Sequence, residues 1–190
     1  MRELEVHRVT PKRWDDVADL FERRGTRGGT PVTSGCWCQY WNLRGKAYHE
    51  GWHGSNRERL QAELASRTLH ALLACDDGVP VGWCRLGPRE SFERLAHAPS
   101  APKSDDEEVW SVVCFYVHSA AKRKGVATAL LEGALEHAAA KGARILEGYA
   151  VREGHMNIDA YTGYLPMFLE AGFEPVLEGP RRIVVRRRLL

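Results

Sequence analysis

The chain has 190 residues, of which 44% are hydrophobic and 27% charged, a composition typical of one globular domain with a sizeable core. Its formal net charge of +2 argues against a general affinity for nucleic acid, and no apolar run has the length of a membrane span. The N-terminus is too polar for a signal peptide, and five scattered cysteines favour reduced thiols over a disulfide framework. We therefore expect one cytoplasmic domain over residues 1–190, with no membrane partner.

The first third of the chain predicts one strand and two helices. Residues 4–9 alternate between apolar and polar side chains, as in a strand with one buried face. Thr10 and Pro11 then have the form of an N-cap and a first helical residue, and they open a helix that continues to Phe21. After a loop rich in glycine and threonine over residues 25–35, the sequence of residues 55–58 matches a capping box for the second helix.

The middle of the chain predicts a hairpin followed by a long loop. Two apolar segments, residues 69–75 and 79–86, are joined by an Asp-Asp-Gly turn and are expected to pair. Residues 90–108 are polar and rich in proline, serine and aspartate, which is typical of a loop, with a helical turn expected over residues 92–95.

The most informative segment starts at residue 109. An apolar stretch rich in β-branched and aromatic residues ends at Val117, and an apolar stripe of helical period begins shortly after it. Between them lies a short basic turn with one glycine: Lys122, Arg123, Lys124 and Gly125. The unpaired N–H groups and the dipole of a helix N-terminus attract phosphate, and a small residue at Ala127 leaves the backbone open to it. This pattern predicts a strand, an anion-binding turn and a helix ending near Gly142.

The last part of the chain predicts a strand over residues 145–151, a short helix over residues 164–171 and a closing pair of strands. The arginine-rich end at residues 181–188 can be a nucleic-acid patch or the exposed edge of the final strand. We favour the edge strand, since a turn at residues 178–180 leads directly into an apolar, β-branched segment.

The basic turn resembles the acetyl-CoA loop of the GCN5-related N-acetyltransferase (GNAT) family. That family has Arg or Gln five residues after the strand end, then x-x-Gly-x-Gly/Ala; here Val117 ends the strand, Lys122 replaces Arg or Gln, and Gly125 and Ala127 follow. A second family landmark, Ala/Leu-Gly-Phe after a short helix, is present at residues 171–173. The predicted order, β-α-α-β-β-β-α-β-α-β-β, is similar to the family's α/β fold, a central mixed sheet with helices on both faces.

The resemblance implies that acetyl-CoA is the acyl-donor co-substrate. In the family, the loop wraps the pyrophosphate with backbone N–H groups, while the fourth and fifth strands splay apart and the fourth holds the pantetheine arm. The residues that this assigns to the donor are Phe115, Tyr116, Val117, Lys122, Arg123, Lys124, Gly125, Val126, Ala127 and Thr128. An amine would attack the thioester directly in a ternary complex, without an acyl-enzyme intermediate.

The family's usual general acid is a tyrosine five residues before the phenylalanine of Gly-Phe. That position is Phe168 here, which cannot donate a proton. Tyr164 lies one helical turn earlier, so we predict that Tyr164 protonates the departing thiolate. Tyr161 is a second candidate, and two further alternatives stay open: both tyrosines only pack, or the thiolate leaves without an acid.

Glu147 is the predicted general base. It lies between Leu146 and Gly148 in an apolar strand and shares a strand face with Tyr149. A buried carboxylate usually has a partner or a task, so Glu147 is either a base acting through a water, an anchor for the substrate ammonium, or a paired structural group.

The aromatic segment at residues 35–41 is the expected acceptor wall. In the family, loops near the first two helices cover the acceptor, and we predict that Trp37, Trp41 and Tyr149 bind it, with Tyr40 and Trp52 nearby. Aromatic walls suit a cation or a planar ring, although these residues can also fill the core under a long loop. The Cys-x-Cys motif has no second pair of ligands at metal-binding spacing, and we predict no metal site.

These observations predict an acyl-CoA-dependent N-acyltransferase, acting with acetyl-CoA on the primary amine of a small molecule. Two alternatives stay open: a transferase that takes its acyl group from a carrier such as aminoacyl-tRNA, with the terminal arginines as phosphate contacts, and a catalytically idle sensor of acyl-CoA. The expected partner is the amine substrate; nucleic acid is not expected, and a homodimer is left open.

Overall fold

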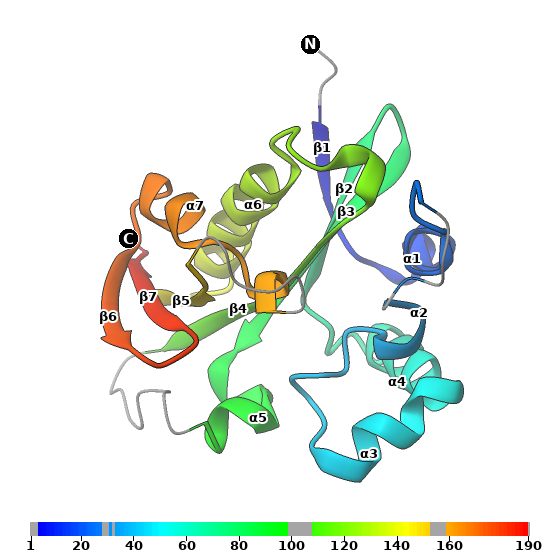
Figure 1. Ribbon diagram of the computed structural model, residues 1–190, viewed down its shortest axis with the longest axis horizontal. Coiled ribbons are helices and arrows are strands. Elements are labelled where there is room, and N and C mark those ends of the chain that lie inside the picture. The colour runs from blue at the N-terminus through cyan, green and yellow to red at the C-terminus, as the bar shows by residue number, and fades with distance from the viewer. Residues whose placement is uncertain (1–3, 28–30, 32, 99–107, 153–158, 190) are drawn as a thin grey trace.

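The structure is a computed structural model that describes residues 4–27, 31, 33–98, 108–152 and 159–189. A seven-stranded sheet with the order β1-β2-β3-β4-β5-β7-β6 forms its centre (Figure 1). Neighbouring strands are antiparallel except β4 and β5, so the sheet is mixed, as predicted. The strands are β1 (Leu4–Arg8), β2 (Ala71–Asp76), β3 (Val79–Pro88), β4 (Val109–Val117), β5 (Ile145–Ala150), β6 (Glu174–Glu178) and β7 (Ile183–Arg188).

Helices cover both faces of the sheet. One face packs α6 and α7 through a core that includes Leu130, Leu131 and Phe168, and the other packs α1 and α4 through Phe21 and Leu60 (Figure 1). The α-helices are α1 (Trp14–Glu22), α2 (Thr33–Cys36), α3 (Gly45–Glu50), α4 (Ser55–Ala65), α5 (Glu93–Ala96), α6 (Val126–Ala140) and α7 (Leu165–Glu170). Short 3-10 helices are η1 (Pro11–Arg13), η2 (Gly51–His53), η3 (Arg89–Ser91), η4 (Ser119–Ala121) and η5 (Asp159–Thr162). Within the described ranges, no helix is long and apolar enough to cross a membrane.

The N-terminal third departs from the prediction in its helix starts. Pro11 opens the 3-10 helix η1, and α1 begins only at Trp14. The expected capping box does not form, because α4 starts at Ser55 itself and its N-cap is Gly54, at a φ of +142°. The elements α2, α3 and η2 were not predicted; they are short, and their apolar residues show no helical period in the sequence.

The hairpin between β2 and β3 follows the prediction closely. Asp77 and Gly78 form its turn with φ values of +54° and +74°, the left-handed pair of a tight hairpin whose twist matches the strands. The closing strands differ from the expectation. Strand β7 lies between β5 and β6, so β6 and not the arginine-rich β7 forms that edge of the sheet.

Strands β4 and β5 separate along their length, as the family resemblance implies. Their parallel pairing runs only from Val109–Ile145 to Val112–Gly148, while β4 stays paired with β3 up to Val117. Glycine at position 148 makes room for the ring of Phe168 on α7, which lies 2.5 Å from where a Cβ would stand. The far half of β4 therefore turns an unpaired strand edge toward η5 and the start of α7.

Candidate active site

A cavity of about 540 Å³ lies where β4 leaves β5; we call it the loop cavity. The end of β4, the basic turn, the first turn of α6 and the segment from η5 to α7 form its wall. Every residue predicted to bind the acyl donor lines this cavity except Lys124. The lining is Phe115, Tyr116, Val117, Ala121, Lys122, Arg123, Gly125, Val126, Ala127, Thr128, Tyr161, Gly163, Tyr164 and Met167.

The basic turn presents backbone N–H groups to the loop cavity. Arg123 and Gly125 have left-handed φ values of +58° and +78°, and Gly125 is the N-cap of α6. The N–H of Ala129 donates to the Gly125 carbonyl at 2.9 Å, whereas the N–H groups of the three residues between them have no acceptor within the helix. With the helix dipole and the charges of Lys122 and Arg123, this turn suits a phosphate or pyrophosphate.

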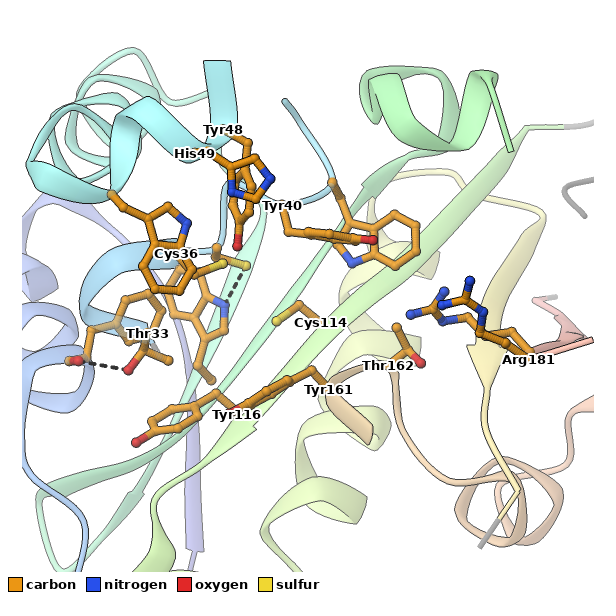
Figure 2. Close-up of a pocket in the computed structure, with 16 residues that line it drawn as sticks. Thr33, Cys36, Tyr40, Tyr48, His49, Cys114, Tyr116, Tyr161, Thr162 and Arg181 are labelled. Carbon is orange, nitrogen blue, oxygen red and sulfur yellow. Dashed lines mark hydrogen bonds between the residues drawn. The ribbon is translucent and has the colours of Figure 1, made fainter. Parts of the chain in front are cut away.

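A second cavity, of about 370 Å³, lies beside the first; we call it the aromatic cavity (Figure 2). Aromatic rings dominate its wall, and three thiols and two arginines join them. None of the described residues that line it is an aspartate or a glutamate. The lining is Phe21, Thr33, Cys36, Cys38, Tyr40, Trp41, Tyr48, His49, Trp52, Trp83, Cys114, Tyr116, Tyr161, Thr162, Arg181 and Arg182.

Two tyrosines form a wall common to both cavities. Tyr116 on β4 and Tyr161 on η5 line each of them, and their rings stack with centroids 6.4 Å apart. Burial, reinforced by the neighbouring Tyr116 hydroxyl and Cys114 thiol, raises the pKa of Tyr161 to about 12. The Tyr161 hydroxyl is therefore protonated at neutral pH and able to donate a hydrogen bond at the point where the cavities meet.

Tyr164, the predicted acid, lines the loop cavity but lies outside the lining of the aromatic cavity. It precedes α7 as its N-cap residue and is 37% exposed. Backbone hydrogen bonds of 2.9 Å from Val151 N to Gly163 O and from Leu165 N to Val151 O tie this residue's neighbours to the end of β5. Tyr164 has extended backbone angles, so it lies just before the helix in which the sequence placed it, and not one helical turn from Phe168.

Phe168, at the position of the family's usual tyrosine, belongs to the core. Its side chain is fully buried and packs edge-on against Phe115 and Phe173, with centroid distances of 6.2 and 5.1 Å. With Gly148 behind it, the ring fills the gap between the splayed strands. A hydroxyl at this position would enter packed side chains rather than an open cavity.

Glu147, the predicted base, is outside the lining of both cavities. The side chain is fully buried, and its carboxylate accepts hydrogen bonds from Tyr149 Oη at 2.5 Å and from Arg186 Nε at 2.8 Å. The Arg89 guanidinium is 3.5 Å away. Two guanidinium groups and a hydroxyl compensate the buried charge, so the arrangement is that of a paired structural carboxylate.

Of the three residues predicted to bind the acceptor, Trp41 alone lines the aromatic cavity. Trp37 is 2% exposed, stacks on Trp14 at 5.8 Å and donates from its indole to Ser34 O, so it belongs to the core. Tyr149 lies behind Trp41, with the rings stacked at 5.7 Å. The structure therefore places Trp37 and Tyr149 behind the wall of this cavity and Tyr40 and Trp52 in it.

The thiols of Cys36, Cys38 and Cys114 meet in the aromatic cavity. The Trp83 indole donates to Cys38 Sγ at 3.2 Å. Burial raises the pKa of Cys38, but hydrogen bonding with Cys114, the charge of Arg85 and the Trp83 hydrogen bond together lower the pKa below its usual value. In the part of the chain that the structure describes, no group of three or more histidine, cysteine, aspartate or glutamate residues is placed to hold a metal ion.

Several wall residues escaped the sequence analysis because they come from separate elements. Tyr48 and His49 belong to the unexpected helix α3, Trp83 to the centre of the sheet, and Arg181 and Arg182 to the turn before β7. Nothing in their local sequence marks them as neighbours. Two of the arginines considered as phosphate contacts have partners within the chain: Arg186 pairs with the buried Glu147, and the exposed Arg187 donates to the Ala171 carbonyl at 2.5 Å.

The site thus combines a splayed mixed sheet, a basic turn at the N-terminus of α6 and a second cavity beside the first. Residues 37–162 match the model of the acetyltransferase (GNAT) family. The chain belongs to this family. A search of curated proteins found no significant match.

Solved structures of acetyltransferases share the fold at low sequence identity. The PaiA N-acetyltransferase of Thermoplasma acidophilum, in complex with coenzyme A, matches with a TM-score of 0.56 at 13% identity, over 98% of this chain and 99% of that one. YncA, a putative acetyltransferase of Salmonella typhimurium with its cofactor acetyl-CoA, matches with a TM-score of 0.56 at 14% identity. The match covers 98% of this chain and 94% of YncA. A structure of Corynebacterium glutamicum described as histone acetyltransferase HPA2 and related acetyltransferase matches with a TM-score of 0.58 at 15% identity. The match covers 100% of this chain and 98% of that chain.

Proposed function

We propose that the protein is an acyl-CoA-dependent N-acyltransferase that moves the acetyl group of acetyl-CoA to the primary amine of a small molecule. The observation that carries this proposal is the pair of cavities that meet at Tyr116 and Tyr161, one with an anion-binding turn and the other walled by aromatic rings. Membership of the GNAT family supports it, as do coenzyme A and acetyl-CoA in the similar PaiA and YncA structures.

The loop cavity is the proposed donor site. The pyrophosphate would lie on the N–H groups at the start of α6, beside Lys122 and Arg123. The pantetheine arm would follow the edge of β4 over Phe115, Tyr116 and Val117, where β4 has left β5 and its backbone can pair with a ligand. The thioester then arrives at the wall that both cavities share.

The aromatic cavity is the proposed acceptor site, and transfer would occur at the common wall. The amine nitrogen bonds to the carbonyl carbon, a tetrahedral oxyanion forms opposite N–H groups at the end of β4, and the carbon–sulfur bond breaks. We assign stabilisation of the departing thiolate to the Tyr161 hydroxyl, because Tyr161 lines both cavities and Tyr164 only one. The thiolate takes up one proton as the ammonium releases its own, so the products are the amide and free coenzyme A.

The test is turnover of acetyl-CoA against a panel of primary amines. Release of the coenzyme A thiol should require an amine, and mass spectrometry should find that amine heavier by one acetyl group. Calorimetry with acetyl-CoA alone checks binding independently of turnover. Binding without transfer to any amine would favour the idle sensor, and absence of both would overturn the proposal.

A further inference from the structure

The aromatic cavity carries positive charge on one side. Arg181 and Arg182, in the turn between β6 and β7, line it, and no lysine, aspartate or glutamate is among the described residues of its wall. Figure 2 shows Arg181 beside Thr162, on the side opposite Cys36 and Thr33. The wall therefore favours a substrate that brings a negative charge to that side.

The arginines line the same cavity as Tyr161, the proposed point of transfer. Thr162 follows Tyr161 directly in the chain, and both line the aromatic cavity with Arg181 (Figure 2). The Arg182 guanidinium lies over the Trp41 ring, 5.5 Å from its centroid, which gives it a defined place in the wall. A compact molecule in this cavity can therefore meet the arginines with an anionic group and Tyr161 with its amine.

The rest of the wall is apolar. Phe21, Trp83, Tyr48 and Trp52 line the cavity away from the arginines and offer ring faces and edges to a bulky apolar group. A volume of about 370 Å³ is near the lower end for small-molecule sites, so it suits a compact molecule. A polyamine would meet two cationic side chains and no aspartate or glutamate among the described wall residues.

We propose that the acceptor is the α-amine of a free amino acid with an aromatic or large apolar side chain, whose carboxylate binds Arg181 and Arg182. The guanidinium fork matches a carboxylate, and the α-carbon holds the carboxylate next to the amine. The inference rests on the proposed function and deepens it: acetyl-CoA and the amino acid give an N-acetyl amino acid, free coenzyme A and one proton.

The first experiment compares kcat/KM for L-phenylalanine with that for phenethylamine, which lacks the carboxylate, at saturating acetyl-CoA. Charge-assisted hydrogen bonds predict a preference for phenylalanine of about 10- to 100-fold. The Arg181→Gln variant, and the double variant with Arg182→Gln, should bring the ratio toward one, whereas Arg181→Lys should keep part of it. Arg188→Gln is the matched control, because Arg188 is exposed on β7 and lies outside the wall of both cavities; its ratio should equal that of the wild type.

A second experiment does not depend on turnover. Trp41, Trp52 and Trp83 line the cavity, so tryptophan fluorescence can follow binding of 3-phenylpropanoate, a carboxylate without an amine. We expect saturable binding that Arg181→Gln weakens by about 10-fold or more and Arg188→Gln leaves unchanged.

The outcomes separate the two proposals. Transfer to amines with equal kcat/KM for phenylalanine and phenethylamine, or a ratio that the Arg181 and Arg182 variants leave unchanged, overturns the acceptor class and leaves the transferase standing. If no amine is acetylated and acetyl-CoA does not bind, the proposed function fails. The fluorescence titration still decides the ligand class in that case: no saturable binding, or binding insensitive to Arg181→Gln, overturns it.

Discussion

The loop cavity and the aromatic cavity differ in how the chain builds them. The wall of the loop cavity comes from two short stretches, residues 115–128 and 161–167, and it includes the unpaired backbone N–H groups at the start of α6. The wall of the aromatic cavity is made of side chains from many elements between Phe21 and Arg182. A site that binds through backbone groups keeps its ligand through most substitutions, because a substitution leaves the backbone in place. A site that binds through side chains can change its ligand after a single substitution. We therefore expect single substitutions to change the ligand of the aromatic cavity more readily than that of the loop cavity.

The largest expected effect tests the backbone site. Gly125→Asp would place a carboxylate where the pyrophosphate is proposed to lie, so affinity for acetyl-CoA should fall by roughly 100-fold or more in calorimetry. The matched control is Gly142→Asp after the end of α6. Both glycines have positive φ, +78° and +85°, and no neighbouring atom within 4 Å of an added Cβ, so both variants carry similar backbone strain. Equal affinities in the two variants would refute the placement of the donor.

The next effect tests the wall that the cavities share. Tyr161→Phe should lower kcat by about 100-fold with little change in KM for acetyl-CoA, the signature of an interaction made in the transition state. Tyr164→Phe, a change of equal size on the loop side only, should lower kcat by less than about 3-fold. Because the pKa of Tyr161 is about 12, deprotonation of this residue should cause no loss of activity between pH 8 and about 10. A larger loss of kcat in Tyr164→Phe than in Tyr161→Phe would instead identify Tyr164 as the general acid.

A third prediction tests the claim that Glu147 serves neither cavity. Arg186→Gln removes a guanidinium 2.7 Å from the buried carboxylate and should lower the free energy of unfolding by on the order of 3 kcal/mol, measured by urea denaturation. Arg188→Gln, exposed on the same strand, should change it by less than about 0.5 kcal/mol. Glu147→Gln with wild-type stability and a lost kcat would instead restore Glu147 as a base.

The smallest effect concerns a histidine pair outside both cavities. His70 Nδ1 lies 3.3 Å from His137 Nε2; burial, with the charges of Arg8, His70 and Lys141, lowers the pKa of His137 to about 4, and burial also lowers the pKa of His70. In the unfolded chain these histidines take up protons near pH 6.5, whereas in the folded chain they do so only at lower pH. The free energy of unfolding is therefore not reduced by this pair at pH 7, and it falls as the pH is lowered from 6.5 toward 4.

His137→Gln tests that sign, since glutamine does not titrate. The urea midpoint of the wild type should fall between pH 7 and pH 5, and the variant should lose a smaller amount over the same interval. His53→Gln, at an exposed site, is the control and should follow the wild type. An unchanged pH dependence in His137→Gln would show that other groups cause the loss.

The sequence predicted the sheet and the loop cavity well because both depend on local pattern. Alternation, the hairpin turn and the basic turn after Val117 each occupy contiguous residues. Side-chain direction and long-range pairing were not predictable in this way. Trp37 and Cys38 have left-handed φ values of +45° and +55°, and this turn buries the Trp37 indole in the core. The ion pairs of Glu147 with Arg89 and Arg186 could not be predicted because these arginines are distant in the sequence. Strand β7 was misplaced because sequence order does not give strand order.

The shared tyrosine wall leads us to expect thermodynamic coupling between the two proposed sites. Tyr116 and Tyr161 contribute surface to both cavities, so a donor that orders these rings completes part of the acceptor's surroundings. If bound donor raises the affinity for the acceptor by some factor, linkage requires that bound acceptor raises the affinity for the donor by the same factor. Steady-state kinetics with both substrates varied would then show each apparent KM changing with the concentration of the other, and Tyr161 is the residue at which that coupling is altered most directly.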